Sequence, residues 1–202
     1  NFSKSIADEL YSLKDVEVDN FVDLLLLIKE KTSIGASRIE DLIKIDYFSE
    51  FGNMKKLLRT LSLFDSLYDK SKKCLKKQLS KNKVSEIELT HDIVKRYSHK
   101  ETEKTYMMVD MYGLLKEYNS LSFRDCSVIE KVKFQQEILG TLKIIDKRCK
   151  GIACVQSVDT KYSPKLKCYA IANGNIVEVK IDKKLFSKTP LKEGDVILIK
   201  NI

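Results

Sequence analysis

The spacing of the hydrophobic positions divides the chain into two parts. From the start to about residue 139, apolar residues recur every three or four positions, which predicts amphipathic helices. After Gly140 the pattern changes to short β-branched and apolar runs separated by turn residues, which predicts strands. We therefore expect an α+β protein, with a helical domain over residues 1–120, a connecting helix over 121–140 and a small antiparallel β domain over 141–202.

Two short helices joined by a tight hairpin are predicted between residues 33 and 60. Ser37 is followed three residues later by Glu40, which is the spacing of a capping box at a helix start. Asp46-Tyr47-Phe48 interrupts the helical pattern, and Gly52-Asn53 is typical of a stop followed by a new helix cap. Each helix has an apolar stripe, formed by Ile39, Leu42 and Ile43 in the first and by Met54, Leu57, Leu58 and Leu61 in the second.

Further helix signals lie on both sides of this pair. Asn20 can cap a helix that begins at Phe21, and residues 86–121 predict one or two helices of mixed charge. Ser127 and Glu130 form a second capping box, which opens a helix carrying Ile129, Val132 and Leu139 and ended by Gly140. Lysines are dense from Lys70 to Lys83 with no acid among them, which indicates either a solvated helix end and loop or a stripe that follows phosphates.

The last 60 or so residues have the pattern of a small β domain. Strands are predicted at 152–158, 166–172, 176–181 and 195–200. Asn173-Gly174 between the second and third strands is a two-residue hairpin signal. Four or five short strands fit an OB-type barrel, and any other small antiparallel β domain is the alternative.

The composition favours an anionic partner. The chain has 202 residues, a net charge of +8 and a pI near 9.1. This balance suits a nucleic-acid binder and equally a lysine-rich soluble surface.

The chain's five cysteines are odd in number and lack a zinc-ligand spacing, so we expect reduced thiols in the cytoplasm and no metal site. The longest apolar run, residues 21–28, is too short to cross a bilayer. Because the chain begins at Asn1 without Met, we expect a piece of a longer protein, with a processed protein as the alternative.

No arrangement of residues that would catalyse a reaction is found in the sequence. There is no Asp-x-Asp pair to hold two metal ions, and no glycine-rich phosphate loop. Only two histidines are present, and no Ser/His/Asp or Cys/His arrangement is suggested. We therefore expect this chain to catalyse nothing by itself and to carry no cofactor.

Residues 42–58, 134–140 and 164–199 form three segments that, taken together, resemble bacterial replicative DNA polymerase III alpha subunits. Residues 42–58, LIKIDYFSEFGNMKKLL, are similar to the family's "L-I-K-x-G-A-F-D-x-L-G-x-x-R-x-x-L" segment, with Asp46 and Tyr47 in place of Gly-Ala. Residues 134–140 are similar to its "E-x-E-x-L-G" helix, although no His-Pro pair follows. Residues 164–199 contain runs similar to strands of its OB domain. The order of these segments is more specific than any one of them.

The resemblance implies the C-terminal, DNA-binding part of such a polymerase, with the catalytic domain and its Mg²⁺ elsewhere in the parent protein. A helix-hairpin-helix module would grip duplex phosphates through N–H groups near Gly35, Gly52 and Asn53 and through basic side chains. An OB domain would hold single-stranded template DNA with lysines and stacking aromatic rings. The candidate side chains are Lys31, Arg38, Lys55, Lys56 and Arg59 for the duplex, and Lys161, Tyr162, Lys165, Lys167 and Tyr169 for the single strand, although Tyr169 can equally belong to the core.

Two other classes of function remain open at this stage. Met108, Met111 and Tyr112 stand where some family members carry a motif for the sliding clamp, and the same residues fit an ordinary buried helix face. The chain would then be a protein-interaction module that binds the clamp or a clamp-loader subunit. A free-standing OB-type single-strand-binding protein is the third possibility.

Overall fold

The computed structural model describes residues 4–67, 72–79 and 91–199. The chain divides into two compact units, Phe2–Asp125 and Cys126–Ile202. Helices come first and antiparallel sheets follow, so the predicted α+β class is confirmed. Within the described ranges, no helix is long and apolar enough to cross a membrane.

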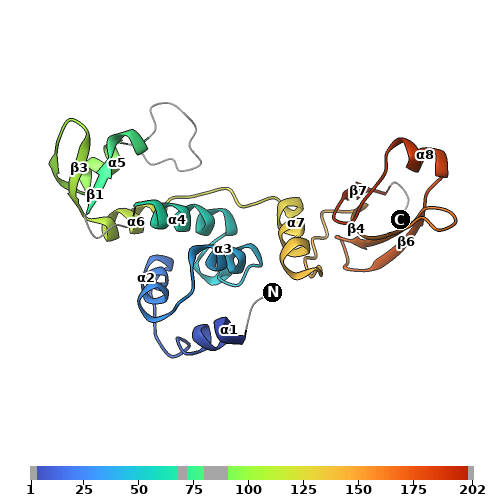
Figure 1. The fold of residues 1–202 in the computed structure, drawn as a ribbon, viewed down its shortest axis with the longest axis horizontal. Coiled ribbons are helices and arrows are strands. Elements are labelled where there is room, and N and C mark those ends of the chain that lie inside the picture. Colours follow the sequence, from blue (N-terminus) through green and yellow to red (C-terminus); the bar gives the residue numbers. More distant parts are fainter. Residues whose placement is uncertain (1–3, 68–71, 80–90, 200–202) are drawn as a thin grey trace. The chain divides into compact units, whose positions relative to one another are not determined.

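Five helices and one short 3-10 turn build most of the first unit. They are α1 (Lys4–Tyr11), α2 (Phe21–Lys31), α3 (Ala36–Lys44), η1 (Ser49–Phe51), α4 (Met54–Leu67) and α6 (Met111–Ser120). Figure 1 shows α4 beside α6 and next to α3. Asn20 caps α2 as predicted, because its side chain accepts the N–H groups of Val22 and Asp23. The core between these helices is formed by fully buried side chains: Phe21, Leu25, Ile28, Ile43, Leu57, Leu114, Leu115 and Tyr118.

A small antiparallel sheet interrupts the helices of this unit. Its strands are β1 (Lys73–Leu75), β2 (Ser98–Glu101) and β3 (Thr105–Val109), in the order β1-β3-β2, accompanied by the 3-10 turn η2 (Lys76–Gln78) and by α5 (His91–Arg96). The prediction of helices alone over residues 86–121 is therefore wrong for residues 91–121, while residues 86–90 lie outside the described residues.

The physical reason for this sheet lies in two short stretches. The aromatic and β-branched residues of β3 favour a strand. Thr102, whose hydroxyl accepts the Thr105 N–H, closes the turn between β2 and β3. Within the lysine-rich stretch from Lys70 to Lys83, the described residues form β1 from Lys73 and then η2. Lys70, Lys81 and Lys83 lie outside the described residues.

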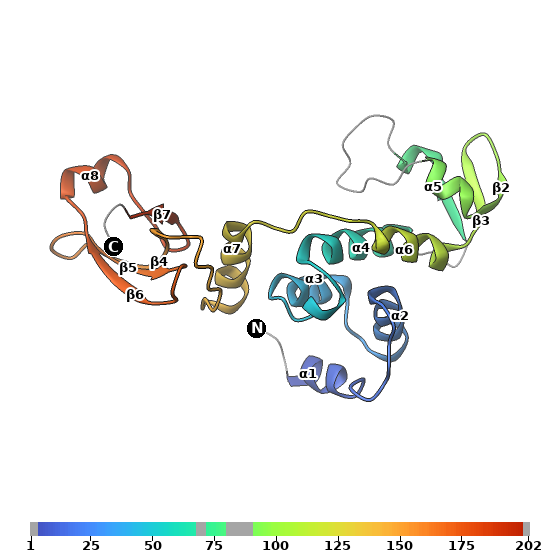
Figure 2. The same cartoon turned by 180° about the vertical axis from the view of Figure 1, so that it is seen from behind.

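The second unit is a four-stranded antiparallel sheet with one helix on each side. Its elements are α7 (Val128–Leu139), β4 (Ile152–Asp159), β5 (Lys165–Ala170), β6 (Ile176–Lys180), α8 (Lys183–Lys188) and β7 (Val196–Leu198), and the strand order is β6-β5-β4-β7. Gly174, at φ +75°, lies in the β5–β6 turn, where the left-handed backbone favours glycine. Figure 2 shows α8, which the sequence pattern did not predict, beyond the end of β6.

The two ends of α7 agree with the prediction. Ser127 and Glu130 form the capping box, and Gly140 ends the helix at φ +66°. Of the three apolar positions named for this helix, only Val132 is buried, whereas Ile129 and Leu139 are 40% and 39% exposed. The inward face of α7 also carries Gln135, whose side chain accepts the Lys143 N–H at 3.0 Å.

Candidate nucleic-acid interface

The start of α4 is covered by the segment that follows α6 (Figures 1 and 2). The Asn53 side-chain oxygen accepts the Lys56 N–H at 2.9 Å, and its amide nitrogen donates to the Phe123 carbonyl at 2.8 Å. The Asp125 carboxylate accepts the Lys55 N–H at 3.4 Å. Asn53 thus caps the helix as predicted, but the N–H groups of Lys55 and Lys56 already have acceptors within the chain. This differs from the open helix start that the sequence led us to expect for phosphate binding.

The basic side chains of α4 differ in their roles. The Arg59 guanidinium lies 5.0 Å over the Phe123 ring, and its Nε is buried with no hydrogen-bond partner among the described residues. Arg59 therefore packs the segment after α6 against α4. Lys55 and Lys56 are half-buried and have no carboxylate partner in the described ranges, so they remain available to an anion.

A second helix start, that of α3, is more open. Its N-cap residue is Gly35, and no side chain accepts an N–H group there. The predicted capping box at Ser37 is wrong, because α3 already begins at Ala36 and Glu40 instead pairs with Lys44 at 2.7 Å. Within the described chain, the N–H groups of Ala36 and Ser37 have no acceptor.

The hairpin between α2 and α3 already holds one carboxylate. The Glu9 side chain from α1 accepts the Ser33 N–H at 2.6 Å and the Ser33 hydroxyl at 2.8 Å. Lys31 and Arg38 flank this hairpin and are largely exposed, although each has an acidic neighbour on its own helix. The hairpin therefore offers donors and positive charge to an anion, with Glu9 as an internal competitor.

The sheet of the second unit has two different faces. Leu166 and Cys168 point from β5 into a core that includes Phe186 of α8. Lys165 and Lys167 alternate with them and are exposed on the opposite face. Lys165 is directly paired with Lys180 of β6, which is also exposed. The exposed part of this face on β5 and β6, formed by Lys165, Lys167 and Lys180, is called the lysine face.

Two acids moderate the charge of the lysine face. Asp159 of β4 lies opposite Lys165, and Glu178 of β6 lies opposite Lys167. Lys180 was not among the predicted site residues. Strand alternation could have found it, because the β5–β6 hairpin places it beside Lys165.

The two tyrosines predicted to stack on bases have different environments. Tyr162 is 75% exposed in the β4–β5 loop, with the Lys161 ammonium 5.5 Å from its ring centre. Tyr169 is only 6% exposed; it packs against Val132 and donates its hydroxyl to the Ile144 carbonyl at 3.1 Å. Burial also raises the pKa of Tyr169. Tyr169 therefore belongs to the core and presents no ring face to a base, so Tyr162 alone remains as a candidate for stacking.

The predicted clamp-binding residues do not form one exposed anchor. Met108 lies on β3 at φ +52° and is 60% exposed, whereas Met111, in the first turn of α6, is 5% exposed. Tyr112 donates its hydroxyl to Asp23 at 2.6 Å, and the Lys116 ammonium lies over its ring. The three side chains belong to a strand and a helix joined at Asp110, so neither one helix face nor one extended peptide contains all of them.

The thiols have a structural role. All five cysteines are free, and only Cys149 is not buried. Burial raises the pKa of Cys74 to about 11 and also raises the pKa of Cys154 and Cys168, which disfavours the reactive thiolate. Among the described residues, no group of three or more histidine, cysteine or acidic side chains could hold a metal ion.

Comparisons with known proteins found no similarity. No family model matches the chain, and no curated protein or solved structure matches it either. The resemblance to polymerase alpha subunits therefore stays a prediction from the sequence.

Proposed function

We propose that the chain is a DNA-binding segment of a DNA polymerase III alpha subunit, which grips duplex and single-stranded template DNA without reading its sequence. In this proposal the helices of the first unit act as a helix-hairpin-helix-type module, and the sheet of the second unit belongs to an OB-type domain. Both would keep the template on the enzyme and so support processive replication. The catalytic carboxylates and Mg²⁺ would lie elsewhere in the parent polymerase.

The lysine face is the observation that carries the proposal. Ammonium groups on one exposed sheet face can follow a phosphate backbone, and the adjacent Tyr162 ring can stack on one base. Because Asp159 and Glu178 lie among the lysines, we expect micromolar rather than tight binding.

Duplex DNA would be bound by the first unit. The open N–H groups at the start of α3 and the neighbouring Lys31 and Arg38 can contact one phosphate, and Lys55 and Lys56 can contact another. All of these would be phosphate contacts, which carry no sequence information, so binding would be independent of sequence.

The test is fluorescence anisotropy with labelled single-stranded, duplex and primer–template DNA at low salt. The double variant Lys165→Glu/Lys167→Glu reverses two charges on the lysine face. Lys183→Glu/Lys184→Glu is the matched control, because it changes the net charge equally on α8, whose Phe186 packs on the opposite face of the sheet.

The proposal predicts that the first variant weakens single-strand binding about tenfold, as expected for a loss near 1.4 kcal/mol, while the control changes it less than about threefold. Equal losses in the two variants would show that only net charge matters. An absence of binding to all three DNAs at low salt would refute the proposal.

A further inference from the structure

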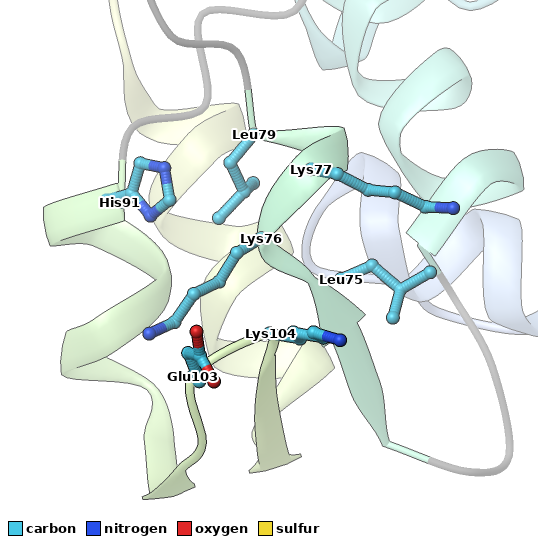
Figure 3. A pocket seen from close by; sticks show the side chains of 7 residues that line it. All are labelled: Leu75, Lys76, Lys77, Leu79, His91, Glu103 and Lys104. Carbon is cyan, nitrogen blue, oxygen red and sulfur yellow. The ribbon is translucent and has the colours of Figure 1, made fainter.

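A pocket of about 710 Å³ opens in the first unit, where β1 passes into η2 (Figure 3). This volume lies within the range of about 300–1,000 Å³ that is typical of small-molecule sites. Its walls combine apolar side chains, Leu75 and Leu79, with three lysines, Lys76, Lys77 and Lys104, and with His91 and Glu103.

The lysines of this pocket are not equally neutralised. Lys76 is paired with Glu101 at 2.5 Å and lies 5.0 Å from the Tyr106 ring centre, so it has a structural partner. Within the described chain, Lys77 and Lys104 have no carboxylate partner. Figure 3 shows their side chains extending in a similar direction, with Leu75 between them. Together with Glu103, the acidic side chain among the described lining residues, they leave the pocket with an excess of positive charge next to an apolar surface.

His91 gives the pocket a group that can recognise a polar ring edge. Its Nδ1 lies 3.2 Å from the Tyr106 hydroxyl, an interaction that fixes the ring, and its Nε2 has no hydrogen-bond partner among the described residues. Figure 3 shows His91 and Leu79 on neighbouring walls of the pocket. The His91 imidazole and the Leu79 side chain could therefore contact one flat, partly polar group.

We propose that this pocket binds a nucleoside phosphate, with the base against His91 and Leu79 and the phosphate at Lys77 and Lys104. A phosphate concentrates its negative charge in a few oxygens, whereas the faces of a base are apolar, so one ligand can meet both the ammonium groups and the apolar side chains that line this pocket. The same chemistry is present in a free nucleotide and at the 5′-phosphorylated end of a DNA strand. The inference depends on the pocket alone and does not require the lysine face of the other unit to bind DNA.

The two histidines of the chain provide a direct test by NMR of their ring signals. His91 lines the pocket, whereas His99 is exposed on β2 and does not, so it serves as an internal control. Titration with dATP is expected to shift the His91 signals saturably and to leave those of His99 in place. A 5′-phosphorylated oligonucleotide that shifts His91 at lower concentration than dATP would identify a strand end as the source, and the reverse order would identify the free nucleotide.

Variants show whether the lysines hold the phosphate. Lys77→Glu and Lys104→Glu should each weaken dATP binding about tenfold, the effect of losing one charge-assisted contact. Lys100→Glu, an equal charge change on β2 outside the pocket, should change it less than about twofold.

Several results would overturn the proposal. The first is that the His91 signals do not shift at about 5 mM dATP, a concentration at which a specific site of this kind would be occupied. The second is that the signals of His91 and His99 shift equally. Tripolyphosphate or an acidic peptide that binds as tightly as dATP would also overturn it, because the base would then contribute nothing.

Discussion

Replacing Asn53 separates two contacts that hold the first unit together. The side-chain oxygen caps α4, and the side-chain nitrogen ties the segment after α6 to the start of α4 through the Phe123 carbonyl. Loss of an N-cap costs about 1 kcal/mol, and loss of one hydrogen bond costs about 1 kcal/mol more. Asn53→Ala should therefore lower the free energy of unfolding by about 2 kcal/mol. Asn53→Ser, which keeps a capping oxygen but lacks the amide nitrogen that donates to the Phe123 carbonyl, should lower it by about 1 kcal/mol.

Urea unfolding followed by far-ultraviolet circular dichroism measures these differences, since most of the described helical residues lie in the first unit. Asn20 is the matched control, because it caps α2 and ties no distant segment. Asn20→Ala should cost about 1–1.5 kcal/mol, and Asn20→Ser less than about 0.5 kcal/mol, because serine keeps the cap and loses only the local bond from the amide nitrogen to Asp23 on the same helix. If Asn53→Ser were as stable as the unchanged protein, the link to Phe123 would contribute nothing and the covering of α4 would be wrong.

Three further predictions concern single side chains. Glu9→Gln removes the carboxylate that competes at the α2–α3 hairpin, so duplex DNA should bind about two- to threefold more tightly, measured by anisotropy. Glu17→Gln, an equal charge change at an exposed position outside the hairpin, should have less effect. An equal gain in affinity in both variants would contradict the competition by Glu9. Cys149 should react with a thiol reagent before the four buried cysteines, and simultaneous reaction of all five in the folded protein would contradict the described core. The neighbouring Arg148 lowers the pKa of Asp146 from its ordinary 3.8 to about 2, so the stability that this carboxylate contributes is present above pH 3.8 and is lost as the pH falls toward 2. The difference in unfolding free energy between the unchanged protein and Asp146→Asn should therefore shrink over that range, and a constant difference would contradict the assignment.

Local signals in the sequence were sufficient for much of the fold. The caps at Asn20 and Ser127 and the hairpin at Asn173-Gly174 were correct because each depends on a few neighbouring residues. The pairing of β1 with β3 was missed because it joins residues about 30 positions apart, which no local periodicity records. The β2–β3 hairpin is local, and it was missed because the aromatic and β-branched residues of β3 were assigned to a helix. Ser37 was misplaced as a cap because Gly35, which has no side chain to signal its position, begins the helix.

The candidate site was predicted less completely. Lys165 and Lys167, which were named as candidates from the sequence, are exposed on β5, while the residues that alternate with them, Leu166 and Cys168, are buried. The covering of α4 by Phe123 and Asp125 could not be foreseen, because it joins residues about 70 positions apart. Tyr169 lies on the same side of β5 as the lysines, and it is buried because α7 covers only that end of the face.

The measurement that tests the central claim most directly is the salt dependence of single-stranded DNA binding. Each phosphate contact contributes about 0.7 to the slope of log K against log salt concentration, so a lysine face with three ammonium groups predicts a slope of about −2. A slope of about −2 that becomes shallower in Lys165→Glu/Lys167→Glu would support DNA binding at this face. A slope near zero, or no binding at low salt, would contradict the account.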